Sequence, residues 1–274
     1  MELRPLSLLA APPAPAPGSW TVFPYTDIPR FDAQTVRQHW KRLHAGQGAD
    51  PAPPAGPLLE GWALYHSGEF ESAAAIGLQH GAAGFSLANQ ATCVYANYLE
   101  PREGFRQALF RQVAERCAAQ AEAAPEDCQA LFWQAYALGR YSHGINVARA
   151  MAQGLGGRLK GALERVIALQ PRHADAHVAL ASFHADVINK VGALVGRMTY
   201  GVRAETAMAL YERGLDLHPA SAHALIEYAH GLLMLHGDAR MDEATRLYQR
   251  AVAIVPADAR QRLDQELARA GLED

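Results

Sequence analysis

Apolar and small side chains recur every three or four residues from Leu58 onward, which is the period of an amphipathic helix. Proline or glycine interrupts this pattern repeatedly, and each interruption predicts a turn between two helices. The predicted turns fall at Gly68, Pro101, Pro125, Pro171, Pro219 and Pro256. No convincing run of alternating apolar and polar residues bounded by turns occurs. The pattern therefore predicts an all-α protein without a sheet.

The residues before this region differ from it in composition. Two stretches, 1–19 and 49–57, are rich in proline and alanine, and the first of them is typical of an extended, mobile arm. The sequence therefore predicts two parts: an N-terminal arm at 1–56 and a helical domain at 57–274.

One short helix is predicted inside the arm. Asp32 has the residue type of an N-cap, and Val36, Trp40 and Leu43 would lie on one side of the helix that follows. A helix of this length is not stable alone, so we expect Trp40 to anchor it on the helical domain.

Two segments near the C-terminal end share one pattern. Residues 207–219 and 244–256 both contain alanine, then tyrosine four residues later, and end on a proline. A looser copy spans residues 159–171. We expect the two tyrosines, Tyr211 and Tyr248, to be buried between helical hairpins.

This pattern resembles the second helix of the tetratricopeptide repeat (TPR), a helical hairpin of about 34 residues. Residues in the slots of the family's first helix follow Pro125, Pro171 and Pro219, with a small side chain where two helices approach closely. The small residues are Ala135, Ala181 and Ala229. The resemblance spans roughly residues 57–256 and implies a right-handed α-α superhelix (solenoid) of about five TPR-like hairpins with long insertions.

The spacing of the prolines indicates which units exceed the length of a regular repeat. Steps of 46 residues after Pro125 and 48 after Pro171 require longer helices or richer turns in two units. Residues 187–200 are too apolar for a free loop, and we expect the helix before them to continue to Val195, with Gly201 ending the segment. The whole insertion of this unit, residues 186–203, is similar to one in the regulator of microtubule dynamics family.

A C-terminal capping helix is predicted to begin near Asp258. Asp258 and Gln261 have the spacing of a capping box. Leu263, Leu267 and Leu272 would then cover the last hairpin.

Composition narrows the classes of function. The 25 basic and 28 acidic side chains leave a net charge of −3, without the basic face that nucleic acid requires. Three cysteines without C-x-x-C spacing argue against disulfides and structural zinc. No apolar run is long enough for a membrane span, and the N-terminus lacks a secretory signal. We therefore expect a cytoplasmic protein.

Three groups of residues could carry chemistry, and each has a structural interpretation that we favour. His173, His177 and His184 with Asp175 could face a metal, but two of these histidines occupy packing slots. The glycine-rich residues 154–161 follow no strand, so a turn for close helix packing is favoured over a nucleotide loop. Ser142 and His143 have no acidic residue at a recognisable spacing. We predict no cofactor, no metal and no enzymatic activity.

The TPR resemblance implies that side chains of the first helices line a concave groove. Carried onto this sequence, the candidate binding residues are Trp62, Tyr65, Gln129, Phe132, Tyr136, Arg140, Asp175, Ser182, His223 and His230. The predicted function is recognition of a protein or peptide partner, with a bidentate grip of Arg140 on a ligand carboxylate. The alternatives are an adaptor acting through residues 187–200, or a small-molecule or hydrolase site in the groove.

Overall fold

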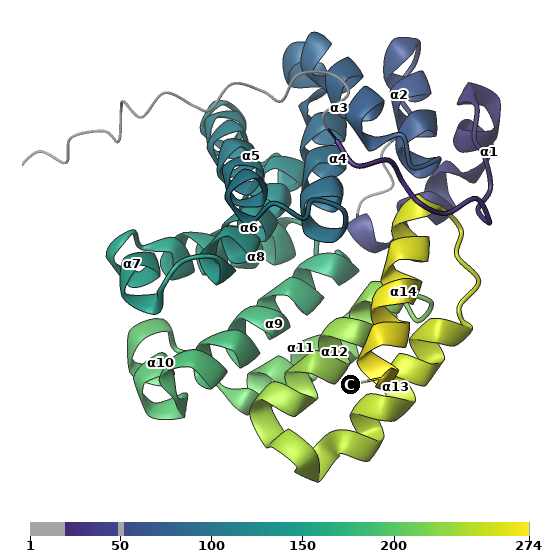
Figure 1. Ribbon diagram of the computed structural model, residues 1–274. Coiled ribbons are helices and arrows are strands. Elements are labelled where there is room, and N and C mark those ends of the chain that lie inside the picture. Colours follow the sequence, from purple (N-terminus) through teal and green to yellow (C-terminus); the bar gives the residue numbers. More distant parts are fainter. Residues whose placement is uncertain (1–19, 49–51, 274) are drawn as a thin grey trace, which may run out of the picture.

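The computed structural model describes residues 20–48 and 52–273, which fold almost entirely into helices (Figure 1). No strand occurs within these two ranges, as the sequence predicts. The α-helices are α1 (Ala33–Leu43), α2 (Pro57–His66), α3 (Phe70–Gln79), α4 (Phe85–Tyr98), α5 (Glu103–Ala123), α6 (Cys128–His143), α7 (Val147–Ala152), α8 (Leu155–Leu169), α9 (Ala174–Val191), α10 (Ala193–Tyr200), α11 (Ala204–Leu217), α12 (Ala222–His236), α13 (Met241–Ala253) and α14 (Ala259–Glu273). Short 3-10 helices occur at η1 (Ala45–Gln47), η2 (Gly81–Ala83) and η3 (Gly237–Arg240). The arm predicted at 1–19 lies outside the described residues.

Five helical hairpins follow one another along the chain. They are α2/α3, α4/α5, α6/α8, α9/α11 and α12/α13. Their first helices touch in succession, and α14 contacts the last of them, α12. This arrangement is the predicted α-α superhelix of five hairpins, and all six predicted turns fall between helices.

The two long insertions form extra helices. In the third hairpin α7 lies between α6 and α8, and in the fourth α10 lies between α9 and α11. The prediction of one continuous helix to Val195 is wrong, because Gly192 adopts a φ of +83° and ends α9. The other end was predicted correctly, since Gly201 in the left-handed conformation terminates α10.

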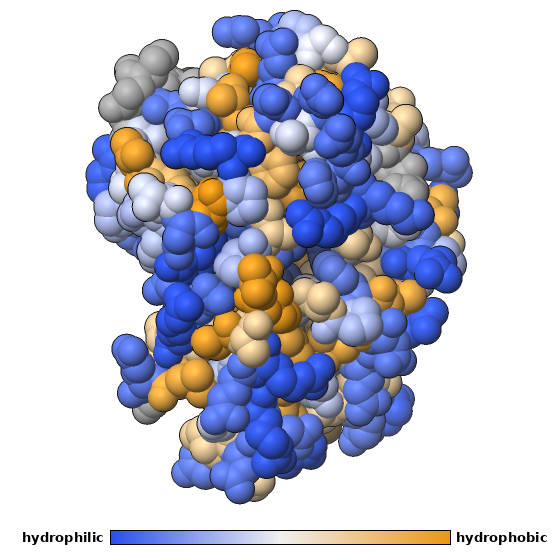
Figure 2. Space-filling model, turned by 90° about the vertical axis from the view of Figure 1, so that its right-hand side faces the viewer, coloured by the Kyte–Doolittle hydropathy of each residue, from blue (hydrophilic) through white to orange (hydrophobic). Residues whose placement is uncertain are grey.

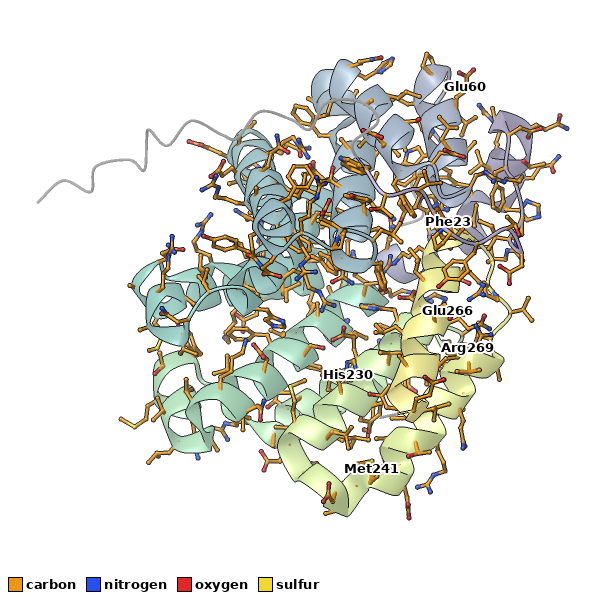
Figure 3. The ribbon with its side chains drawn as sticks, viewed as in Figure 1. Phe23, Glu60, His230, Met241, Glu266 and Arg269 are labelled. Atoms are coloured by element: carbon orange, nitrogen blue, oxygen red, sulfur yellow. The ribbon has the colours of Figure 1, made fainter. Side chains whose placement is uncertain are left out.

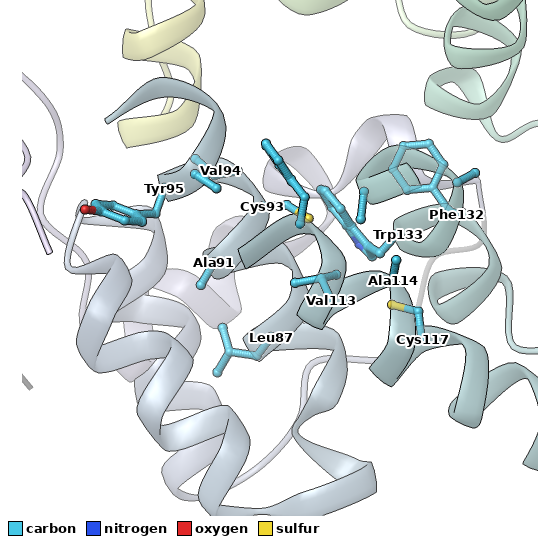
Figure 4. Packing of buried hydrophobic residues seen from close by; sticks show 14 of the residues in the cluster. Leu87, Ala91, Cys93, Val94, Tyr95, Val113, Ala114, Cys117, Phe132 and Trp133 are labelled. Atoms are coloured by element: carbon cyan, nitrogen blue, oxygen red, sulfur yellow. The ribbon is translucent and has the colours of Figure 1, made fainter. Parts of the chain in front are cut away.

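The repeat core has the packing that the tyrosine pattern predicts. Tyr211 is 0% exposed and Tyr248 is 4% exposed. The Tyr211 ring stacks on Tyr228 with centroids 5.0 Å apart. A second cluster fills the N-terminal half, where Cys93 and Trp133 pack between α4, α5 and α6 (Figure 4).

The short helix α1 is anchored as expected. The Asp32 carboxylate accepts a hydrogen bond from the Thr35 backbone N–H at 2.7 Å, which caps the helix. Val36 and Trp40 are buried, and the Trp40 ring meets Trp62 of α2 edge-on at 5.6 Å. The division of the chain at residue 56 stays a prediction.

The C-terminal helix α14 corrects one prediction. Asp258 caps it by accepting from the Gln261 backbone N–H at 2.9 Å, and Leu263 is buried. Leu267 and Leu272, however, are exposed, so the prediction that they cover the last hairpin is wrong. The reason is that α14 presents small residues to α13: a Cβ on Gly271 would meet the Tyr248 ring at 2.8 Å.

The same helix also reaches back to the N-terminal hairpin (Figure 1). His66 Nδ1 donates to the Asp258 carboxylate at 2.6 Å, and Arg262 donates to Asp27 at 3.0 Å. Glu266 and Arg269 lie further along α14 (Figure 3). Figure 2 shows the face that carries α1, α13 and α14, where apolar side chains gather in the middle between hydrophilic ones. The inner side of the superhelix is therefore partly occupied by the chain's own last helix.

Within the described part of the chain, no helix combines the length and apolar character needed to cross a membrane.

Candidate functional site

An apolar cavity of about 220 Å³ lies between the third and fourth hairpins. The helices α6, α8 and α9 form its walls, α7 and α10 border its mouth, and α12 contributes to its inner end. Leu155, Leu159 and Leu163 line the cavity from α8, and Phe183 lines it from α9. The extra helices of the two insertions thus help to build the cavity.

The inner end of the cavity is polar and already paired. Arg140 Nη2 donates to Glu227 Oε1 at 2.9 Å, and the Ser182 hydroxyl donates to Glu227 Oε2 at 2.8 Å. Burial alone would raise the pKa of the Glu227 carboxyl, but the Arg140 guanidinium brings this pKa down to about 2. The pair is therefore ionised at neutral pH, and its charges cancel inside the cavity.

Four predicted binding residues line this cavity together: Tyr136, Arg140, Ser182 and His223. They come from three different first helices, α6, α9 and α12, as the TPR resemblance implies. The Arg140 guanidinium lies 5.3 Å from the centre of the Tyr136 ring. The expected side-by-side ring and cation are thus present, but Glu227 holds the cation.

Four others lie in or against the core. Trp62, Tyr65 and Phe132 are buried, so these three side chains do not line the larger cavity, although Tyr65 borders a smaller one described below. Gln129 is half-buried, donates to the Gln47 side chain at 3.3 Å and accepts from the indole of Trp133. The physical reason is that η1 and α14 pack where an open superhelix would present these residues.

The last two occupy separate places. Asp175 lines a small polar cavity of about 40 Å³ at the N-terminal end of α14, with Arg260 Nη1 4.0 Å from its carboxylate. His223 borders both cavities. His230 lies on α12 (Figure 3), and its ring packs against Tyr248 at 5.7 Å, away from the larger cavity.

Sequence reasoning missed Glu227, which accepts the hydrogen bonds of Arg140 and Ser182 in the cavity. A usable signal existed, because Glu227 is the single acidic residue of α12, a helix made mostly of apolar residues with three histidines. A charge at such a position has to find a partner when the helix is buried. The partner, Arg140, is 87 residues away and could not be assigned from the sequence.

The rim of the cavity brings Ser142, His143 and Asp186 near one another. His143 Nε2 lies 3.5 Å from the Asp186 carboxylate, so an acidic neighbour exists that the sequence did not reveal. The Ser142 hydroxyl instead donates to the Gly139 carbonyl at 2.7 Å. No hydrogen bond between Ser142 and His143 occurs in the described structure.

The other candidate sites have structural explanations. No group of three or more His, Cys, Asp or Glu side chains with the geometry to hold a metal ion occurs in residues 20–48 and 52–273. The turn predicted at residues 154–161 is mostly wrong, because only Gly154 precedes α8 and the other glycines lie in its first turns. Close packing is correct, since a Cβ on Gly156 would meet the Tyr200 ring at 2.8 Å. Cys93, Cys117 and Cys128 are all buried and free.

Comparison with known proteins supports the fold assignment. No family model and no curated protein matches this sequence. Among solved structures, the chain is similar to TTC0263, described as a thermophilic TPR protein in Thermus thermophilus, with a TM-score of 0.56. The match covers 78% of this chain and 97% of that one at 17% identity, which shows the fold alone.

The chain therefore has a TPR-like fold. The similarity to the regulator of microtubule dynamics family stays a prediction.

Proposed function

We propose that the chain is a scaffold that binds a segment of a partner protein, and that the segment enters the cavity between α6/α8 and α9. The observation that carries this proposal is the convergence of Tyr136, Arg140, Ser182 and His223 on one open apolar cavity. Open apolar concavities with a few converging polar groups are the usual form of a recognition site.

The size of the cavity favours a side chain over a free small molecule. Sites for drug-sized ligands usually occupy about 300–1,000 Å³, whereas this cavity measures about 220 Å³. A volume of this size suits a bulky apolar side chain that anchors a longer segment outside. Interfaces of this kind depend on a few buried anchors, and the surrounding contacts contribute less.

The polar groups of the cavity already bond to one another, so they favour an apolar anchor. The sequence suggested that Arg140 would grip a ligand carboxylate, but this guanidinium is bonded to Glu227. An entering carboxylate would have to displace Glu227 and leave this buried carboxylate without its guanidinium partner, which is costly. The anchor that we propose is therefore aliphatic or aromatic, with the Tyr136 ring beside it.

Residues 187–200, the segment of the alternative adaptor role, also contribute to this cavity. Lys190, Val191 and Tyr200 of that segment line the same cavity. The groove and the inserted segment are then two parts of one binding surface.

A cavity-filling substitution tests the proposal. Ala150 of α7 lines the cavity, whereas Ala148 of the same helix is exposed and does not. A displayed library of random 16-residue peptides is selected on the parent protein and counter-screened on Ala150→Trp and Ala148→Trp. We expect the selected peptides to bind the parent and Ala148→Trp alike and to bind Ala150→Trp at least tenfold more weakly.

Thermal melts check that each variant is folded. If Ala150→Trp does not melt cooperatively, Met151→Trp takes its place, since Met151 also lines the cavity and is partly exposed. Equal binding of the selected peptides to a folded, cavity-filled variant and to the parent would contradict the proposal.

A further inference from the structure

Two segments that contribute side chains to the cavity are rich in basic residues. Residues 144–163 and 187–204 contain six basic side chains and no acidic one, in a chain whose net charge is −3. The six are Arg149, Arg158, Lys160, Lys190, Arg197 and Arg203. The two segments thus have a local excess of positive charge, opposite in sign to the net charge of the whole chain.

Most of this charge is unpaired. Lys160 and Lys190 bond to Glu164 and Asp186 within their own helices. The four arginines are exposed, and none takes part in an ion pair among the described residues. Four guanidinium groups are thus free to meet a ligand, and each can donate two parallel hydrogen bonds to a carboxylate.

The same two segments also carry exposed apolar side chains. Of the 11 exposed large hydrophobic residues of the described chain, five lie on the two short helices α7 and α10. They are Val147, Met151, Leu194, Val195 and Met198, of which Leu194 is 72% and Met198 79% exposed. Isolated apolar side chains are normal on a surface, but clustering of this kind marks an interaction site.

Both short helices border the cavity. Val147 and Met151 of α7 and Tyr200 of α10 line the same cavity, and the close approach of Gly156 to the Tyr200 ring joins α8 to α10. Figure 1 shows α7 and α10 next to each other at one side of the molecule. We call this surface, made of the five apolar and four unpaired basic side chains, the α7/α10 rim.

We infer that the partner segment is acidic and amphipathic, with apolar side chains toward the cavity and carboxylates toward the arginines of the α7/α10 rim. This inference rests on the proposed function and adds the chemistry of the ligand. An anionic membrane would also attract exposed apolar and basic side chains. A flat bilayer, however, cannot fill the concavity that the rim surrounds, whereas an amphipathic helix fits its apolar face into a groove.

Defined peptides test the inference. One 18-residue peptide has leucine at helical spacing and glutamate at the other positions. Its two matched forms carry lysine for every glutamate, or serine for every leucine. We expect the leucine–glutamate peptide to bind the parent protein at least tenfold more tightly than either matched form, with affinity that falls as salt rises.

Charge reversal then locates the contact. Arg149→Glu with Arg197→Glu should weaken binding of the leucine–glutamate peptide at least tenfold. The matched control is Arg37→Glu with Arg42→Glu, which reverses two exposed arginines on α1 and changes the net charge equally. The control should bind like the parent, because a long-range effect of net charge would affect both double variants alike.

The outcomes separate the two proposals. The inference is overturned if the glutamate and lysine peptides bind equally, or if both double variants lose the same affinity for the leucine–glutamate peptide. Weaker binding of the selected peptides to Ala150→Trp would still support the cavity as the binding site. Binding of the acidic peptide that Ala150→Trp leaves unchanged overturns the proposed cavity site instead. Binding of phosphatidylserine-containing vesicles without binding of the acidic peptide also overturns the inference, because the α7/α10 rim then recognises a membrane.

Discussion

Lowering the pH from 7 to 5 should reduce the free energy of unfolding by about 4 kcal/mol, because two buried histidines are neutral in the folded chain. Burial lowers the pKa of His44 to about 3 and that of His173 to about 4, from the usual 6.5. An unfolded chain binds a proton at each position below pH 6.5, which amounts to about 2 kcal/mol for each histidine at pH 5.

The hydrogen bonds explain why the folded state resists protonation. His173 Nδ1 accepts from the Ala176 backbone N–H at 3.1 Å and caps α9, so a proton on this nitrogen would remove the cap. His44 Nδ1 bonds the Trp40 carbonyl at 3.0 Å, which leaves Nε2 for an added proton. Nε2 is buried without a hydrogen-bond partner in the described structure, and the His66 ring lies 5.2 Å from that of His44.

The sign of the effect follows from the lowered pKa values. The contribution of these histidines to the free energy of unfolding is fully present above pH 6.5. It decreases as the pH falls toward 4 and then 3. Urea unfolding at pH 7, 6 and 5 measures the change. His173→Asn keeps a capping acceptor and cannot titrate, so its loss between pH 7 and 5 should be about 2 kcal/mol smaller. A free energy of unfolding that is equal at pH 7 and 5 would show that the two histidines are not buried as described.

Tyr211→Ala should destabilise the fold by about 3 kcal/mol, since the change removes a fully buried ring and leaves a cavity. The ring lies on Tyr228, and Gly231 leaves it room, because a Cβ there would meet the Tyr211 ring at 2.4 Å. The hydroxyl lies 3.0 Å from the Ser182 hydroxyl.

Tyr211→Phe is the matched control for this substitution. It keeps the ring and removes one hydrogen bond, so a loss of about 1 kcal/mol is expected. Urea unfolding of the two variants separates the contribution of ring packing to the free energy of unfolding from that of the hydrogen bond. If the Tyr211→Ala variant unfolds at the urea concentration of the parent, the assignment of Tyr211 to the repeat core is wrong.

Local signals in the sequence predicted most of the fold. Each proline ends a helix because it lacks the N–H that the helix requires, so Pro125, Pro171 and Pro219 marked true boundaries. Ala207 and Tyr211 recur as Ala244 and Tyr248 because each hairpin packs on the next in the same way. Both signals act within one unit and are visible without knowledge of distant contacts.

Contacts between distant units could not be predicted in this way. The bond between His66 and Asp258 joins residues 192 positions apart and brings α14 against the first hairpin. Helical periodicity shows which face of a helix is buried but does not name the neighbour that buries it. For that reason Trp62, Tyr65 and Phe132 were expected in an open groove and lie in the core. The cavity instead depends on the insertions, whose break at Gly192 was also missed.

Methyl NMR of methionine tests the central claim most directly, because the six methionines sample different surfaces. Met151 and Met234 line the cavity and Met198 lies on the α7/α10 rim, whereas Met208 and Met241 lie elsewhere. A peptide from the displayed library is titrated into protein labelled with ¹³C at its methionine methyl groups. Binding in the cavity predicts shifts at Met151, Met234 and Met198, with Met208 and Met241 unchanged. Shifts at Met208 or Met241 without shifts at Met151 and Met234 would contradict the account.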